Sequence, residues 1–289
     1  PPVSPGAAVR GPDGRIWGAD RLSGGLAAVT TAGVVTQYTA PPLYATLTIG
    51  TDGYLYAGDG ALSGAIEKIS PSTGTSLSST VTTYPVVGAA TGPDGNVWVT
   101  ESGSSSGIIG VLTPSGVLNQ YNVSIIPSPT PVGIAAAPDG TMWFCDNQSG
   151  GGASEIDSVS MTGTFTLVAS IASDTCGSIA FQSDGKAAWV ASGATTNAYR
   201  IDAATHAVAT VALSGTPYAI AAGADNAIYI TETGGATGWV ARIGNTAASP
   251  YTPSEIVVPN GFPTGIALGA DGRMWYGENS VDKIGALSP

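Results

Sequence analysis

The chain of 289 residues carries 20 acidic and 9 basic side chains, which gives a net charge of −11. Such a charge repels a polyanion, and no apolar run reaches the roughly 18 residues of a membrane-spanning helix, so nucleic-acid binding and direct membrane insertion are not expected. With 43% hydrophobic residues, 10% charged residues and 41 glycines, the composition is typical of a turn-rich all-β protein.

A repeated turn organises the chain from end to end. Short apolar runs end in Asp-Gly, or once in Asp-Asn, and an aromatic residue follows within four residues. The turn aspartates are Asp13, Asp52, Asp94, Asp139, Asp184, Asp225 and Asp271, and the aromatics are Trp17, Tyr56, Trp98, Trp143, Trp189, Tyr229 and Trp275. A spacing of about 40 to 45 residues is typical of four-stranded propeller blades. We therefore predict one domain over residues 1–289, a seven-bladed β-propeller with blade repeats near 6–40, 44–84, 86–124, 131–169, 177–213, 217–258 and 263–289.

The predicted strands follow one order in each repeat. In the third repeat they cover 87–91, 96–101, 108–112 and 117–121, with a Gly-Pro-Asp-Gly turn between the first two. First strands are rich in Gly and Ala, as expected where seven backbones converge. We assign the turn aspartates to capping of their own turns and the aromatics to packing between neighbouring blades.

The last repeat ends directly after its third strand. Counting then gives seven first, second and third strands but six outer ones, or 27 in total. Pro1-Pro2-Val3-Ser4-Pro5 is a poor closing strand because proline donates no ladder hydrogen bond. We predict an exposed edge at Val281–Ser288, where a protein partner or a second copy could add a strand.

An acid ends the second strand in six repeats, at Asp20, Asp59, Glu101, Asp146, Glu232 and Glu278, with Ser192 in the fifth. These positions share a rim with the residues that open the first strands. Converging carboxylates suit Mg²⁺ or Ca²⁺, and Glu278, Glu101 and Glu232 are the metal-site candidates. The alternative is that each acid accepts backbone N–H bonds within its own or a neighbouring blade. The sevenfold repetition favours this structural interpretation, so no cofactor is expected unless a Mg or Ca ion binds there.

Three further features bear on location and contacts. Cys145 and Cys176 fall near one rim in adjacent blades, where they form either a disulfide or two buried thiols. Two sequons begin at Asn122 and Asn147, and loops 102–107 and 148–154 are rich in Ser and Gly and lie on the acidic rim. The start at Pro1 and the low lysine content favour an extracellular or cell-surface protein, including a virion component.

Gly92-Pro93-Asp94-Gly95-Asn96-Val97-Trp98-Val99-Thr100-Glu101 resembles the repeat of the streptogramin lyases, the virginiamycin B lyase family, and Lys283-Ile284-Gly285-Ala286-Leu287 is similar to that family's third-strand motif. The resemblance covers all seven repeats. It implies a seven-bladed propeller that linearises a cyclic depsipeptide by elimination with a magnesium ion. Of the family's catalytic rim, the Glu-x-His-Gly segment reads Phe262-Pro263-Thr264-Gly265 here, the second histidine is Tyr218, the tyrosine is Gly6, and Glu278 alone is kept. The single histidine, His206, lies between the outer strands of the fifth repeat.

An elimination needs a base near neutral pH, and histidine is the usual one. We therefore predict a non-catalytic, secreted or surface-exposed propeller that serves as a binding or structural module, with a small ligand or protein partner at the acidic rim. One alternative is a metal-dependent lyase or hydrolase in which Glu278 or Tyr218 transfers the proton. A second is a structural subunit of a virion or extracellular filament.

Overall fold

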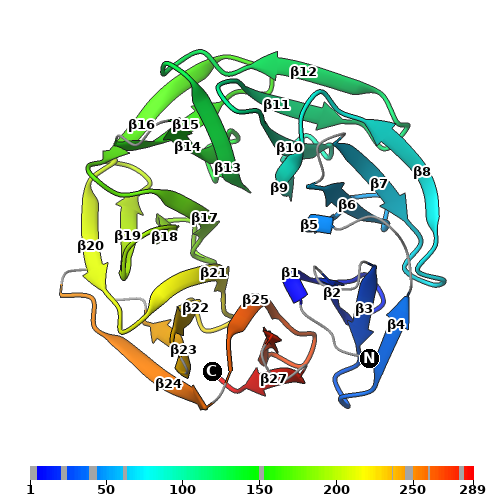
Figure 1. Cartoon of the computed structure of the whole chain (residues 1–289), viewed down its shortest axis with the longest axis vertical. Coiled ribbons are helices and arrows are strands. Elements are labelled where there is room, and N and C mark those ends of the chain that lie inside the picture. Colours follow the sequence, from blue (N-terminus) through cyan, green and yellow to red (C-terminus); the bar gives the residue numbers. More distant parts are fainter. Residues whose placement is uncertain are drawn as a thin grey trace.

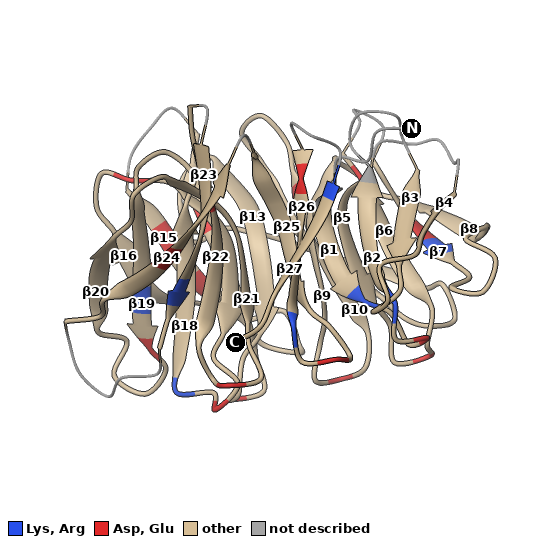
Figure 2. Ribbon diagram, turned by 90° about the horizontal axis from the view of Figure 1, so that it is seen from below, with Lys and Arg blue, Asp and Glu red and all other residues tan. Residues whose placement is uncertain are grey.

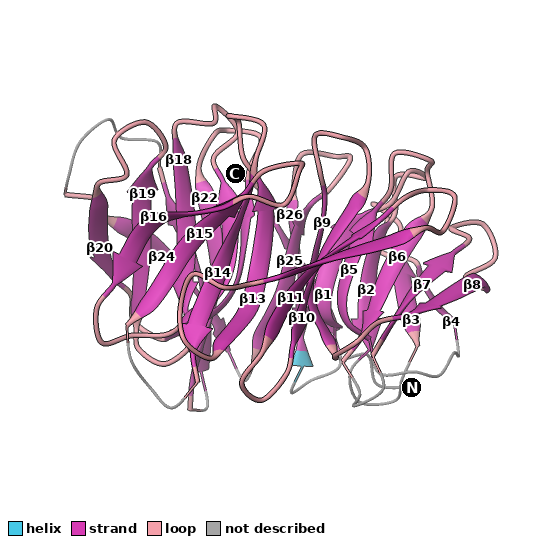
Figure 3. Cartoon of the chain, turned by 90° about the horizontal axis from the view of Figure 1, so that it is seen from above, coloured by secondary structure: helices cyan, strands magenta, loops and turns pink. Residues whose placement is uncertain are grey.

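The computed structural model describes residues 5–20, 25–38, 44–60, 64–149, 153–235, 237–244, 250–259, 261–279 and 283–289. Seven antiparallel sheets stand around a central channel, and the first strand of each sheet lies innermost (Figure 1). Figure 3 shows that strands make up nearly all of the regular structure. No helix in these residues is long and apolar enough to cross a membrane. The predicted seven-bladed all-β propeller is confirmed.

Each blade follows the order of its strands along the chain. Blade 1 consists of β1 (Pro5–Arg10), β2 (Ile16–Asp20), β3 (Leu26–Val29) and β4 (Val35–Tyr38). Blade 2 consists of β5 (Tyr44–Ile49), β6 (Leu55–Asp59), β7 (Ala65–Ile69) and β8 (Ser76–Val81). Blade 3 consists of β9 (Val86–Thr91), β10 (Val97–Ser102), β11 (Gly107–Leu112) and β12 (Leu118–Asn122). Blades 4 and 5 consist of β13 (Pro129–Ala136), β14 (Met142–Gln148), β15 (Ser154–Val159), β16 (Phe165–Ile171); β17 (Cys176–Phe181), β18 (Ala187–Ser192), β19 (Asn197–Asp202) and β20 (Val208–Ala212). Blades 6 and 7 consist of β21 (Thr216–Ala222), β22 (Ile228–Gly234), β23 (Thr237–Ile243), β24 (Pro253–Pro259); β25 (Pro263–Leu268), β26 (Met274–Glu278) and β27 (Lys283–Leu287).

The blade aromatics form the contacts between neighbouring blades. Trp17 of blade 1 packs with Tyr44 and Leu55 of blade 2. Trp275 of blade 7 closes the ring against Ile16 of blade 1. The other five aromatics also lie in clusters with the following blade. All seven are at most 4% exposed, so their rings fill the interfaces between blades.

The turn aspartates lie together on one face of the ring, which we call the turn face (Figure 2). Each accepts the backbone N–H two residues ahead, a pattern repeated in all seven blades. Five of them also accept a hydrogen bond from the aromatic of their own blade, at Trp17, Tyr56, Trp98, Tyr229 and Trp275. The turn therefore orients the ring that packs against the next blade.

Small residues on the inner strands allow close approach of the blades. A Cβ on Gly88 would lie 2.2 Å from the carbonyl oxygen of Val132, and one on Gly265 would lie 2.8 Å from the backbone of Ala7. Real Cβ atoms do not come that close. The Gly- and Ala-rich first strands are therefore required by the convergence of backbones at the channel.

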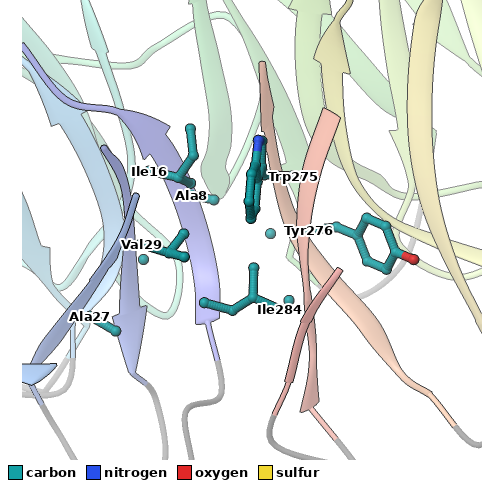
Figure 4. A pocket seen from close by; sticks show the side chains of 10 residues that line it. Ala8, Ile16, Ala27, Val29, Trp275, Tyr276 and Ile284 are labelled. Atoms are coloured by element: carbon teal, nitrogen blue, oxygen red, sulfur yellow. The ribbon is translucent and has the colours of Figure 1, made fainter. Parts of the chain in front are cut away.

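Blade 7 has three strands, as predicted, and it meets blade 1 through a small buried cluster that contains Ile16, Val29 and Trp275. Arg273 crosses between these two blades, donating from Nη2 to the carbonyl oxygen of Thr31 at 2.7 Å. A cavity of about 20 Å³ lies beside Trp275, Ile284 and Val29 (Figure 4). Within the described residues β27 pairs only with β26, so its other edge is open there. Val281 and Asp282 of the predicted edge, and Pro1–Ser4, lie outside the described residues.

Candidate functional site

The face opposite the turn face is the rim at which the second strands end. It carries Asp59, Glu101, Asp146, Glu232 and Glu278 at the ends of β6, β10, β14, β22 and β26. Asp20 ends β2, but its side chain lies outside what the structure describes. Glu101, Asp146 and Glu232 are 0% exposed. Most of the rim acids are therefore buried between blades.

Glu101 holds the loop that enters its own blade from blade 2. Its Oε2 accepts the backbone N–H groups of Thr83 and Tyr84 at 2.9 and 3.2 Å. The amide of Gln120 donates to both carboxylate oxygens, at 2.7 and 2.9 Å. With its acceptors used in this way, Glu101 has a structural role.

Glu232 takes a similar place in blade 6. Its Oε2 accepts the N–H of Gly215 at 2.8 Å, whereas Oε1 is buried without a hydrogen-bond partner. Glu255 lies nearby and accepts the N–H of Ser214 at 3.0 Å. Burial, helped by the charge of Glu255, raises the pKa of Glu232 to about 7.

Blade 5 places its acid differently, which explains the exception at Ser192. Asp174, in the loop before β17, accepts the hydroxyl of Ser192 at 2.6 Å and that of Tyr199 at 2.6 Å. It also accepts the hydroxyl of Thr195 at 2.5 Å. Burial would raise the pKa of Asp174, but these hydrogen bonds outweigh it and lower the pKa. A loop carboxylate thus occupies the place that a strand-end carboxylate holds in other blades.

Glu278 is the most accessible of the rim candidates and lies opposite Lys283 in the pairing of β26 with β27. Burial, with the charge of Glu278 in addition, raises the pKa of the neighbouring Tyr276 phenol. The three metal candidates belong to three different blades, with Glu278 in blade 7, Glu101 in blade 3 and Glu232 in blade 6. Glu101 and Glu232 are hydrogen-bonded within blade interfaces. Among the residues described, no three His, Cys, Asp or Glu side chains are grouped so as to hold a metal ion. The residues that the structure describes therefore do not bring together the ligands of the magnesium site that the family resemblance implies, and no step is derived through a metal.

The channel opens on this rim as a cavity of about 370 Å³. Its wall is formed by inner-strand residues, chiefly Gly, Ala, Val and Ile, and none of the described residues lining it is charged. Tyr218 lies at its mouth and is 37% exposed. Thr264 is 4% exposed and donates to the carbonyl oxygen of Gly277 at 3.4 Å. The cavity suits a neutral, partly apolar ligand contacted by the Tyr218 ring.

The predicted contact loops meet on the rim, as far as they are described. Ser149 donates from its hydroxyl to the carbonyl oxygen of Ser104 at 2.9 Å, which joins loop 148–154 to loop 102–107. Asn147 is bound at both ends of its amide, since Nδ2 donates to the carbonyl oxygen of Cys176 and Oδ1 accepts its N–H. The Asn of the second sequon therefore bridges blades 4 and 5 through both ends of its side-chain amide.

The two cysteines form a disulfide between blades 4 and 5, with their Cα atoms 5.6 Å apart. The sequence left this pairing open, because strand positions alone did not settle the distance between adjacent blades. The Asn147 bridge lies beside it. The rim edges of blades 4 and 5 are thus joined by the disulfide, by the two hydrogen bonds of Asn147 and by the hydrogen bond that Ser154 donates to the carbonyl oxygen of Asp174.

His206 lies on the turn face, in the connection between β19 and β20, where it adopts a φ of 60°. Its ring packs edge-on against Trp143 at 5.6 Å between centroids. It is therefore remote from the rim, as expected, and stands on the opposite side of the ring from Tyr218 and Glu278.

The chain matches the Virginiamycin B lyase family over residues 1–166 and again over residues 126–289. The chain belongs to this family. Among solved structures, this family member is similar to virginiamycin B lyase from Staphylococcus aureus, at 22% identity and a TM-score of 0.82, over 99% of this chain and 95% of that one. A catalytically inactive variant of that enzyme with quinupristin matches at 22% identity and a TM-score of 0.80, over 99% and 94% of the two chains.

More distant structures share the fold alone. The hydrazine synthase of Kuenenia stuttgartiensis matches at 16% identity and a TM-score of 0.82, over 100% of this chain and 96% of that chain. The comparison with curated proteins found no match to this family member. A virginiamycin B lyase and a hydrazine synthase thus share this fold, so the activity must be argued from the site.

The sequence analysis did not predict three acids with buried carboxylate oxygens or several hydrogen bonds: Glu155, Asp157 and Asp174. Asp174 lies in a loop, and loop positions do not repeat from blade to blade. Glu155 and Asp157 alternate with apolar residues along β15, an arrangement typical of a solvent-facing strand side. Because β15 is a third strand within a blade, that side is covered by blade 3. Glu155 and Asp157 could have been predicted as buried acids from two facts together: they alternate with apolar residues, and their strand is an inner strand of a blade, covered on both sides.

Proposed function

We propose that this family member is a non-catalytic, secreted or surface-exposed propeller that binds a neutral ligand at the channel mouth. The observation that carries the proposal is the uncharged wall of the rim cavity around Tyr218. The rim acids Glu101 and Glu232 are turned into the blade interfaces, where backbone N–H groups bind them. Neither is placed to take a proton from a ligand in the channel.

The Cys145–Cys176 disulfide supports the extracellular part of the proposal, since disulfides persist in oxidising compartments. The sequence supports the non-catalytic part. Tyr218 and Thr264 stand where the family resemblance places the rim histidines, and the one histidine of the chain is on the turn face.

The direct test uses quinupristin, the compound found with the inactive S. aureus lyase. We expect that the protein does not linearise quinupristin in the presence of Mg²⁺, as measured by mass spectrometry of the compound. Calorimetry on the chelated protein should show no tight binding of Mg²⁺ or Ca²⁺, with Glu278→Gln compared against the turn-face control Asp94→Asn. Turnover, or metal binding lost only in Glu278→Gln, would overturn the proposal in favour of a metal-dependent lyase or hydrolase.

A second candidate function, a structural subunit of a virion or filament, is favoured by the outer wall of the ring. The six outer strands carry one charged residue, Glu255. Valines stand out on them, with Val81 74% exposed and Val257 55% exposed. Edge strands usually carry charges that block pairing with other chains, so an uncharged wall beside the open edge of β27 favours association.

Sedimentation velocity at micromolar concentration tests this candidate. If the wall drives assembly, Val81→Lys with Val257→Lys should shift the protein to monomer, and Ala204→Lys on the turn face should not. A wild-type protein that stays monomeric would remove this candidate and leave the binding module.

A further inference from the structure

One face of blade 4 gathers three carboxyl groups. In the pairing of β14 with β15, Asp146 stands opposite Glu155, and Asp157 follows two residues along the same side, opposite Phe144. That side packs against blade 3 through a cluster that contains Met142, Phe144, Val159, Trp98, Ile109 and Val111. The three acids, which we call the blade 3–4 cluster, therefore lie in the interface between two blades.

The blade 3–4 cluster is buried and poor in donors. Asp146 and Asp157 are both 0% exposed. Asp146 accepts the N–H of Thr130 at 2.8 Å through Oδ1. Its Oδ2, both oxygens of Asp157 and Oε2 of Glu155 are buried without a hydrogen-bond partner. Burying an ionised carboxylate oxygen without a hydrogen-bond partner in an apolar interface destabilises the fold far more than burying a protonated carboxyl does.

No basic group compensates this cluster. The sequence contains no Lys, Arg or His from residue 69 to residue 185, which covers the whole of blades 3 and 4. Across the interface, β10 contributes the hydroxyls of Thr100 and Ser102, which donate to carbonyl oxygens of Val132 and Pro131. Of the titratable groups, β12 adds the Tyr121 phenol at the edge of the hydrophobic cluster, and β13 and β16 add none.

In two other blades, a tyrosine hydroxyl donates a hydrogen bond to a carboxylate. In blade 2, Tyr44 donates its hydroxyl to Glu67 at 2.7 Å, and in blade 5 Tyr199 donates to Asp174. Tyr44 stands opposite the rim acid Asp59, and the corresponding residue of blade 4, opposite Asp146, is Pro131. Blade 4 therefore keeps the acids but has no phenol at that position to donate to them.

Protonation is the remaining way to satisfy these oxygens. Burial raises the pKa of Asp157 to about 8, with the charges of Asp146 and Glu155 adding to the effect. Burial also raises the pKa of Asp146 to about 7. The hydrogen bond from the Thr130 N–H lowers this pKa, and the charge of Glu155 raises it further. The stability that the protonated Asp146 and Asp157 contribute is complete below about pH 4, the ordinary aspartate value, and is lost as the pH rises through 7 to 8.

We propose that the contact between blades 3 and 4 is a proton-dependent seam, closed while Asp146 and Asp157 hold their protons and loosened when these two carboxyls ionise. This goes beyond the proposed function. The seam lies under the rim loops joined by Ser149 and Ser104, so its loosening alters the surface on which a partner would bind. The propeller is then built for acidic surroundings, and a rise in pH weakens one defined interface.

Thermal unfolding of the whole chain between pH 5 and pH 8.5 tests the proposal. We expect the wild-type midpoint to fall by about 10 °C over this range, and Asp157→Asn to flatten the fall by at least half. Asp139→Asn, on the exposed turn of the same blade, is the matched control and should keep the wild-type slope. Hydrogen exchange, corrected for intrinsic pH dependence, should show faster opening of β10, β11, β14 and β15 at pH 8.5 than of blades 1 and 7.

A second measurement keeps the proposal testable if Asp157→Asn does not fold. The infrared carbonyl band of protonated carboxylic acids is measured in Glu232→Gln, so that the raised pKa of Glu232 does not contribute to it, and the band should be present at pH 6 and diminish by pH 9. Absence of that band, or equal slopes for wild type and Asp157→Asn, would overturn the proposal. Stabilisation by Ca²⁺ or Mg²⁺ at pH 8, lost in Asp157→Asn, would also overturn it, because a cation rather than a proton would then neutralise the cluster.

Discussion

The two faces of the ring use the same residue types in opposite ways. On the turn face, burial would raise the pKa of Asp225, but a hydrogen bond and ion pair with Arg242 outweigh it and lower the pKa. On the rim, burial without a cation raises the pKa of Asp146 and Glu232 to about 7. One repeat therefore supplies two rings of acids, and the surroundings decide which are charged. The turn face is held by partly exposed pairs, and the rim by buried contacts and one disulfide.

The largest effect is expected from removing the rim disulfide. Cys145 and Cys176 are 31 residues apart in sequence, and releasing a loop of that length lowers the unfolding free energy by about 3 to 4 kcal/mol in the chain-entropy account. Urea unfolding of Cys145→Ala with Cys176→Ala measures it. Ser149→Ala in the neighbouring loop should cost far less, and a loss below about 1 kcal/mol in the double variant would contradict the expectation.

Glu101→Ala should come next, at about 3 kcal/mol, because it leaves the N–H groups of Thr83 and Tyr84 and the Gln120 amide without their acceptor in a buried site. Urea unfolding at pH 5 is the measurement. Glu101→Gln keeps one carbonyl oxygen and should cost less than half as much. Equal losses in the two variants would mean that charge, rather than hydrogen bonding, holds the loop.

At the seam of blades 7 and 1, Arg273→Ala removes the bond to Thr31, the ion pair with Asp271 and the cation–π contact with Trp275. We expect a loss of about 1 to 2 kcal/mol. Hydrogen exchange should then accelerate in β25 to β27 alone. Arg15→Ala, which removes similar contacts from blade 1, is the comparison, and opening spread over all blades would argue against a local weak seam.

The smallest change concerns a turn-face pair. Arg242 and Asp225 are joined at 2.6 Å but are partly exposed, so Arg242→Met should cost about 0.5 kcal/mol near pH 7. Because the pKa of Asp225 is lowered in the folded protein, this contribution is present above about pH 4 and lost as the pH falls below it. The unfolding free energies of the wild type and the variant should converge at low pH. At the rim the dependence is reversed, because the raised pKa values of Asp146 and Asp157 make their contribution to stability largest at low pH. Lys186→Met, at a 3.7 Å pair with an exposed lysine, should change little.

Local patterning was enough for the blades, the turns and the aromatic interfaces. A turn such as Asp94-Gly95 followed by Trp98 needs only nearby residues to form its hydrogen bonds, so its structure repeats wherever the motif does. The three-stranded last blade also followed from counting strands. The metal candidates Glu101, Glu232 and Glu278 were less predictable, because a strand-end position does not reveal whether a carboxylate faces the channel or the next blade.

The sequence by itself thus determined the ring, its seven repeats and the sign of its charge, since these depend on periodicity and turn chemistry within about 45 residues. The tertiary structure decided which carboxyls are charged, which cysteines pair and where the acids of β15 lie. Each of these depends on what the neighbouring blade places opposite a side chain, as at Asp157, where blade 3 supplies an apolar wall and no cation. Burial and the local charge, which shift a pKa, arise only when the two blades are packed together.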